Sequence, residues 1–430
     1  MRRIGEAVDA TTAFIGAAVA GITLFLPVAF TVATPTTDQR ISSLMNSGAR
    51  AAALAVIIAV TVAVLITTTT RPVTGWATAL AGAVGQLINH FAGRHASSAD
   101  MLTTENYIDS VCGAILLGAL GAVVLRRPLP AAAFAVGGVA FFVFGDLAEL
   151  LDTDTDPSVV LETPPRWLIG VTVALLIFST LRNWSRTEEQ KTPRMAIALP
   201  VTPILAAMVL APVVLAGTEW LGRQFSKMPD EGHVVEIGIT VAAILVAATA
   251  AAMLLPGRDG IAVYLAVSLI TTVDAVGYTV RPGWVVCILI ALTALGVAGG
   301  ARLPSTAIAI LLVAGIAVFA VVTSTAMSRV GSATISAVIA LTAGYCCGTA
   351  RPHYGPSGVL AIAALYLPSV TSVLPNKVEN DVPVHDATPG WAALAIVIGC
   401  AVGLATLLRL RPQTLRLEKG QPKSESVADI

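Results

Sequence analysis

Charged side chains are scarce in this chain. Asp, Glu, Lys and Arg make up only 12% of its 430 residues, whereas hydrophobic residues make up 56%. Basic and acidic residues are equal in number, so no excess of positive charge is available to attract nucleic acid. A soluble protein of this length could not bury so much apolar surface, but membrane-spanning helices of about 20 residues can expose it to lipid. We therefore predict a membrane protein that has the lipid bilayer as its partner and no nucleic-acid partner.

Motifs for catalysis and for cofactor binding are missing as well. The five cysteines all lie within apolar runs, which favours neither a disulfide framework nor a zinc site. The chain has no glycine-rich phosphate loop, no HExxH pair and no Ser-His-Asp order. The predicted loops are too short for a catalytic domain outside the membrane. We expect no enzyme activity, no cofactor and no bound metal.

What the chain does contain is a long series of apolar runs of helical length. They predict an all-α polytopic membrane protein with about 14 transmembrane helices, and 12 as the lower bound. The predicted spans are roughly 11–34, 49–69, 73–93, 108–125, 129–150, 166–183, 196–218, 235–255, 260–280, 283–300, 304–325, 331–350, 356–373 and 390–408.

The few charges are distributed unevenly between alternate loops. If the N-terminus starts in the cytoplasm, most of the 26 basic residues but fewer than half of the 26 acidic residues fall on the inner side. This is the positive-inside pattern, and it places both termini in the cytoplasm. Abundant alanine and a preference for arginine over lysine favour a bacterial source. We expect a multi-pass protein of the bacterial cytoplasmic membrane.

One stretch of sequence occurs twice. The run from Val111 to Pro130 aligns without gaps with the run from Val286, and eight of seventeen positions are identical. Each copy is an apolar run that ends at an arginine, Arg127 or Arg302, followed by a proline and a second apolar run. The alternative explanation is chance, because the same small apolar residues dominate the whole chain. The repeat predicts two similar halves of six helices each.

The repeat and the charged loops divide the chain into predicted units. They are an N-terminal six-helix bundle (1–185), a cytoplasmic linker (186–195), a C-terminal six-helix bundle (196–350), two additional transmembrane helices (351–414) and a disordered cytoplasmic tail (415–430). This 6+6 arrangement with two extra helices would let the two bundles rock against each other.

Acidic residues inside predicted spans are costly, so each one is a candidate site. Asp274 lies deepest, and Thr271 and Tyr278 lie one helical turn before and after it on the same face. Such a carboxylate can bind a proton or a cation. The alternative is an acid at a helix end that simply faces water.

A second candidate patch lies at the outer end of the third predicted span. Gln86, Asn89 and His90 are its polar residues, and histidine titrates near neutral pH. In the repeat this span corresponds to the one that bears Asp274, so we expect the two patches to form a binding site shared between the halves. An interfacial histidine among lipid headgroups is the alternative.

Two further pairs of acids complete the candidates for coupling or substrate binding. Asp146 and Glu149 lie at i and i+3, which would raise the proton affinity of each, although the acidic residues that follow them suggest a solvated loop. Glu219 and Glu236 flank an outer loop and form a second acidic group.

These features favour a secondary transporter of a small solute, with coupling to protons and alternating access between the two halves. One alternative is a flippase for a lipid-linked envelope precursor, which the two extra helices suit and the absence of arginine at mid-membrane opposes. The other is a non-transporting membrane component of envelope assembly or secretion. The sequence does not identify the solute or any protein partner.

Overall fold

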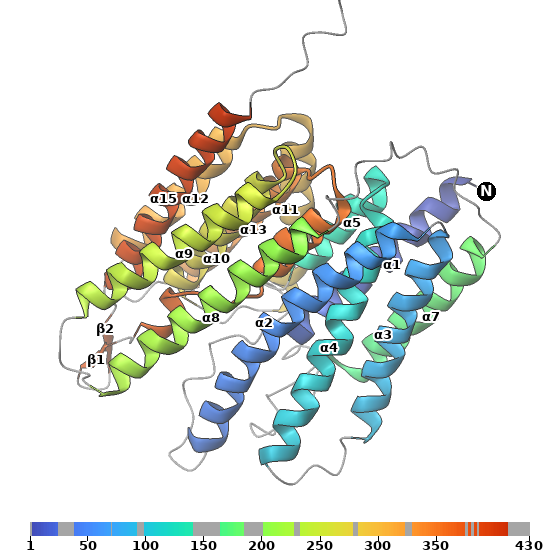
Figure 1. The fold of residues 1–430 in the computed structure, drawn as a ribbon, viewed down its shortest axis with the longest axis horizontal. Coiled ribbons are helices and arrows are strands. Elements are labelled where there is room, and N and C mark those ends of the chain that lie inside the picture. The colour runs from blue at the N-terminus through green and yellow to red at the C-terminus, as the bar shows by residue number, and fades with distance from the viewer. Residues whose placement is uncertain are drawn as a thin grey trace, which may run out of the picture.

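The fold is an all-α polytopic membrane protein (Figure 1). The computed structural model describes residues 2–24, 38–69, 71–92, 99–140, 164–184, 201–227, 233–277, 283–322, 329–374, 377–379, 382–384 and 387–411. Its helices are α1 (Arg2–Leu24), α2 (Asp38–Thr68), α3 (Pro72–Ala92), α4 (Ala99–Val124), α5 (Pro128–Val139), α7 (Arg166–Asn183), α8 (Thr202–Lys227), α9 (Val234–Leu254), α10 (Gly260–Val276), α11 (Gly283–Arg302), α12 (Thr306–Val322), α13 (Arg329–Ala350), α14 (Gly355–Ala364) and α15 (Thr388–Leu410).

In the part of the chain that the structure describes, each predicted apolar run contains one helix, and the predicted fold class is confirmed. Within the described residues, eight helices are long and apolar enough to cross a membrane, and α5, α10, α12 and α14 are shorter apolar helices. A short 3-10 turn, η2 (Thr371–Val373), and two strands, β1 (Lys377–Glu379) and β2 (Val382–Val384), lie between α14 and α15. The strands pair antiparallel, with Val378 opposite Pro383.

The helices run roughly parallel and antiparallel in one bundle with two sides. Helices α1 to α4 and α7 pack on one another on the right of Figure 1, and α9, α10, α12 and α15 pack together on the left. Helices α2 and α8 meet between the two sides. The start of α1 and the end of α15 lie at the same end of the bundle, as the alternation of the spans requires.

The thirteenth predicted span differs from its prediction. The apolar run 356–373 predicts one continuous helix, but α14 ends at Ala364 after 10 residues. Pro368 explains this end, because proline has no N–H to donate to the carbonyl four residues earlier and its ring clashes there. The chain from Leu365 to Leu374 continues as turns inside the protein, and most of its side chains are buried.

The short helix α14 is central to the bundle. It contacts α2 and α4 of one side and α8 and α10 of the other. Eight of its residues are buried, from Pro356 to Ala364. The region 351–414 was predicted as two additional transmembrane helices, and α14 shows that its first part is a half-length helix enclosed by the others.

The predicted repeat is not confirmed by the packing. Helix α4 packs against α1, α2 and α3, whereas α11 packs mainly against α13 and also touches α5. The two arginines also differ, because Arg127 pairs with Asp9 at 3.2 Å and Arg302 is exposed. The division into six, six and two helices stays a prediction, and the linker 186–195 and the tail 415–430 lie outside the described residues.

Small residues let neighbouring helices approach closely, which is the usual packing mode in membranes. A Cβ atom added at Gly118 of α4 would lie 2.2 Å from the carbonyl oxygen of Ala59 in α2. Gly344 of α13 is as close to α11, because its Cβ would lie 2.1 Å from the carbonyl oxygen of Thr293.

This packing predicts opposite effects for two glycine substitutions. Gly118→Ala should lower the free energy of unfolding by about 1–3 kcal/mol, because the methyl group meets backbone that cannot move aside. Gly170→Ala in α7 is the matched control, since nothing lies within 4 Å of its added Cβ. It should be neutral or stabilise by up to about 1 kcal/mol. Denaturant titration in mixed micelles measures both, and equal effects would contradict the close contact.

Candidate functional site

The interrupted helix α14 is held at both ends by named contacts. At its start, the buried carboxylate of Asp259 accepts hydrogen bonds from the backbone N–H groups of His353 and Tyr354 at 2.9 and 3.0 Å. Past its end, the Tyr366 hydroxyl donates to the carbonyl of Gly138 on α5 at 2.9 Å. The half-helix is therefore fixed to the other helices by polar contacts inside an apolar bundle.

The polar residues after α14 lie against the end of α10 that carries Asp274. Thr371 donates to the backbone carbonyl of Thr271 at 3.0 Å, and its hydroxyl lies 2.7 Å from that of Ser369. The hydroxyl of Ser369 lies near the carboxyl group of Asp274. Helix α10 then ends at Gly277, where φ is +80°, a conformation that favours glycine. Asp274 thus lies at the last turn of α10, against a non-helical segment that carries hydroxyl groups.

The predicted partners of Asp274 are only partly those of the structure. The Thr271 hydroxyl is buried and donates to the carbonyl of Val267 at 2.9 Å, so its backbone oxygen joins the cluster in place of its side chain. Tyr278 lies outside the described residues. The sequence did not indicate Ser369, because its contact with α10 depends on the early end of α14.

The second predicted patch forms a buried cluster. The amide of Asn89 donates to Asp109 Oδ1 at 2.9 Å, and His90 Nδ1 lies 3.5 Å from the same oxygen. Gln86 donates to the hydroxyl of Thr23 on α1. The sequence analysis missed Asp109, which begins the apolar part of α4 and whose proximity to α3 no local pattern reveals.

The two patches do not form one shared site among the described contacts. Helix α3, with Gln86, Asn89 and His90, packs against α4 and α7. Helix α10, with Asp274, packs against α9, α12, α14 and α15. The expectation of a site shared by the third and ninth spans is therefore corrected to two separate clusters, one on each side of the bundle.

The remaining predicted acids have specific surroundings or are not described. Glu219 forms an ion pair with Arg50 of α2 at 2.6 Å and another with Arg223 at 2.8 Å. Glu236 is partly exposed and lies 3.8 Å from His233 Nδ1. Asp146 and Glu149 lie outside the described residues. Glu219 thus joins α2 to α8, between the two sides of the bundle.

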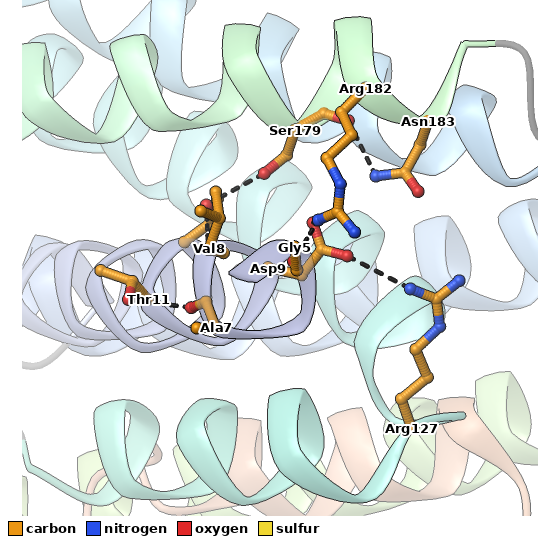
Figure 2. Close-up of polar contacts among 10 residues, drawn as sticks. Gly5, Ala7, Val8, Asp9, Thr11, Arg127, Ser179, Arg182 and Asn183 are labelled. Carbon is orange, nitrogen blue, oxygen red and sulfur yellow. Dashed lines mark hydrogen bonds and ion pairs between the residues drawn. The ribbon is translucent and has the colours of Figure 1, made fainter. Parts of the chain in front are cut away.

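A charged cluster at the opposite end of the bundle was not among the predicted sites. Asp9 of α1 is 1% exposed and pairs with Arg127 at 3.2 Å and with Arg182 of α7 at 3.1 Å. Figure 2 shows both guanidinium groups converging on this carboxylate, that of Arg182 from α7 and that of Arg127 from the turn before α5. Arg182 also donates to the carbonyl of Gly5. One turn along α1, the Thr12 and Ser179 hydroxyls lie 3.0 Å apart.

Neither a protein-family model nor a curated protein matches this chain. Within the described residues, no group of three or more His, Cys, Asp or Glu side chains is placed to hold a metal ion. The arguments about function therefore rest on the geometry of the clusters described above.

The cluster around Asp9 predicts a loss of stability on substitution. Asp9→Asn should lower the free energy of unfolding by about 1–3 kcal/mol, because two guanidinium groups lose the carboxylate between them. Arg302→Gln is the control, since Arg302 is exposed at another turn between helices, and it should change stability by less than about 0.5 kcal/mol. Denaturant titration of both variants in the same micelles tests this, and an unchanged Asp9→Asn protein would contradict it.

Proposed function

We propose that this chain is a secondary transporter of a small solute that works by alternating access between the two sides of the bundle. The observation that carries the proposal is the interrupted helix α14, which lies between the two sides and continues as buried non-helical chain. At membrane depth, such backbone is tolerated only where protein or a water-filled path surrounds it. Discontinuous helices of this kind form the binding sites of many transporters.

The polar groups beside α14 support a path for solute along it. Ser369 and Thr371 are both buried, and their hydroxyls face α10 rather than lipid. The aligned peptide dipoles give the C-terminal end of a helix a partial negative charge, which attracts cations and hydrogen-bond donors. We therefore place the solute site beside the segment from Leu365 to Thr371.

Asp274 is the proposed coupling residue of this path. The nearby hydroxyl of Ser369 can donate to a carboxylate or accept from a carboxylic acid. The carboxyl group can thus keep a hydrogen bond in both protonation states. A proton that binds here changes the charge beside the solute site, as coupled transport requires.

The orientation in the membrane is part of the proposal. Arg127, Arg182 and Arg258 lie at the end of the bundle where α1 starts and α15 ends. The positive-inside rule assigns this end to the cytoplasm of a bacterial plasma membrane. The Asp274 and His90 clusters then lie toward the outside. The proposed activity is transport rather than catalysis.

A non-transporting membrane component is the second candidate function, and the close packing of the helices favours it. Backbone contacts such as those of Gly118 and Gly344 join α2 to α4 and α11 to α13 with little space between them. A rigid bundle of this kind suits a scaffold for other envelope proteins. The two functions differ in whether the segment after α14 becomes accessible to water.

Cysteine labelling tests that difference without knowledge of the solute. In a background lacking the five natural cysteines, Ser369→Cys should react with a membrane-impermeant maleimide, because alternating access opens the path to water. Thr172→Cys is the control, since Thr172 is 0% exposed within the contact between α7 and α1, and it should react at least about tenfold more slowly. Labelling in right-side-out and inverted vesicles identifies the open side. If the Ser369→Cys protein is as inert as the Thr172→Cys protein from both sides, the scaffold function stands.

The coupling role of Asp274 predicts a specific defect in transport. With the solute identified by uptake and efflux assays on a deletion strain, Asp274→Asn should abolish proton-driven accumulation, because the amide cannot bind and release a proton. Exchange of solute should persist, since asparagine keeps the volume and a polar group beside Ser369. Glu236→Gln is the control at a partly exposed acid and should transport normally. Normal accumulation by Asp274→Asn between about pH 5.5 and 8 would exclude the coupling role.

A further inference from the structure

An ion-pair cluster joins α2 to α8 at the boundary between the two sides of the bundle. Arg50 of α2 contacts the carboxylate of Glu219 on α8 through two nitrogen atoms. Its Nε donates to Oε1 at 2.6 Å, and its Nη2 donates to Oε2 at 3.1 Å. Paired bonds between a guanidinium and a carboxylate are stronger and more directional than a single contact. The cluster therefore fixes α2 relative to α8 in this conformation.

Glu219 has a second arginine partner, which comes from its own helix. Arg223 lies at i+4 on α8, and its Nη2 donates to Oε2 of Glu219 at 2.8 Å. The same oxygen accepts the 3.1 Å bond from Arg50. One carboxylate oxygen thus serves two guanidinium groups. Arg223 stays with Glu219 wherever α8 moves, whereas Arg50 moves with α2.

The shared carboxylate lowers the cost of separating α2 from α8. When Arg50 leaves, Glu219 keeps Arg223, so its charge is not left without a partner. While all three groups are together, the two guanidinium groups repel each other, which weakens the hold of Arg50. The side chains of Arg50 and Arg223 are 54% and 68% exposed, so water solvates the guanidinium that is released. The contact between the two helices is therefore reversible.

The same stretch of α8 covers the chain that follows α14. Gly222 lies one turn after Glu219, and a Cβ atom added to it would lie 3.0 Å from Val373 of η2. Figure 1 shows α2 and α8 crossing between the two sides. The cluster lies toward the end of the bundle where α2 begins and α8 ends, which is the outer end in the orientation proposed above. Movement of α8 away from α2 at this end would uncover the segment beside the proposed solute site.

We infer that Arg50 and Glu219 form a reversible outer latch, which holds α2 against α8 and opens to admit solute from outside to the segment after α14. Arg223 is the partner that holds the Glu219 carboxylate while the latch is open. No covalent bond forms or breaks. The inference rests on the proposed function, because a latch needs two sides that move, and it names the contact that controls access to the site.

Pulsed electron resonance between two spin labels measures the opening. The full-length protein without its natural cysteines, in lipid nanodiscs, carries labels at Leu54→Cys of α2 and Val235→Cys of α9, two exposed positions on opposite sides of the bundle. A closed and an open separation are expected. Arg50→Gln should raise the ratio of open to closed protein about two- to fivefold, the range that exposed ion pairs reach. Arg50→Lys keeps the charge without the paired bonds and should have an intermediate effect. Arg302→Gln, at an exposed arginine of another turn, is the control.

Arg223→Gln should have the opposite effect and lower the ratio of open to closed protein. The open state then loses the remaining partner of Glu219, and the closed state loses the repulsion between the two arginines. An increase in salt from about 0.1 to 1 M shortens the Debye length from about 10 to 3 Å, so it should raise the ratio in the labelled parent but not in Arg50→Gln. An ion pair with a purely structural role would lower stability in both arginine variants and leave the ratio unchanged.

The results distinguish the latch from the transport function. Two separations whose ratio Arg50→Gln does not change, or that Arg50→Gln and Arg223→Gln shift in the same direction, overturn the latch and leave alternating access intact. A single separation in every variant overturns the latch alone if the Ser369→Cys protein reacts with maleimide, and overturns both proposals if that protein is inert. Should Arg50→Gln fail to fold, Arg50→Lys and Arg223→Gln must still shift the ratio in opposite directions.

Discussion

The constraint on which this structure depends is that lipid offers no hydrogen-bond partner to an unpaired backbone group. Most of the chain satisfies this constraint because continuous helices pair their own backbone groups. The non-helical chain after Ala364 cannot pair its groups in this way, so it can exist only where other helices surround it. The buried contacts of Tyr366 with Gly138 and of Thr371 with Thr271 are the consequence. The arrangement of the bundle around α14 follows from the need to enclose this one segment.

Close approach of the helices is the means by which that enclosure is achieved. Helices in lipid gain no hydrophobic free energy by meeting each other, so packing of small residues and polar contacts must hold them. Gly118 and Gly344 allow backbone contacts within pairs of helices, and Glu219 with Arg50 joins α2 to α8 between the two sides. The centre is packed as closely, because a Cβ atom added at Gly121 of α4 would lie 2.4 Å from Val359 of α14.

The sequence predicts the number and order of the helices because each apolar run is long and the loops are marked by proline and charge. It does not predict where α14 ends, although Pro368 is visible, since apolar residues on both sides of the proline resemble one continuous span. The contact partners of the candidate residues are harder to predict than the helices. Asp109 contacts His90 from another helix, and Ser369 reaches Asp274 only because helix α14 ends early. The periodicity of apolar residues carries no information about such contacts. The similarity of residues 111–127 to 286–302 predicts two similar halves, which the contacts of the described helices do not confirm.

The acids of the bundle that the structure describes differ in what compensates their charge. Asp9 and Glu219 each face two arginines, and Asp259 accepts from two backbone N–H groups. Those donors cannot accept a proton, so they suit a permanent carboxylate. Asp274 lies near the hydroxyl of Ser369, and Asp109 lies 3.5 Å from the imidazole of His90. Asp259 lies 3.6 Å from the imidazole of His353 as well. Asp274 and Asp109 belong to opposite sides of the bundle, so their surroundings are set by different helices.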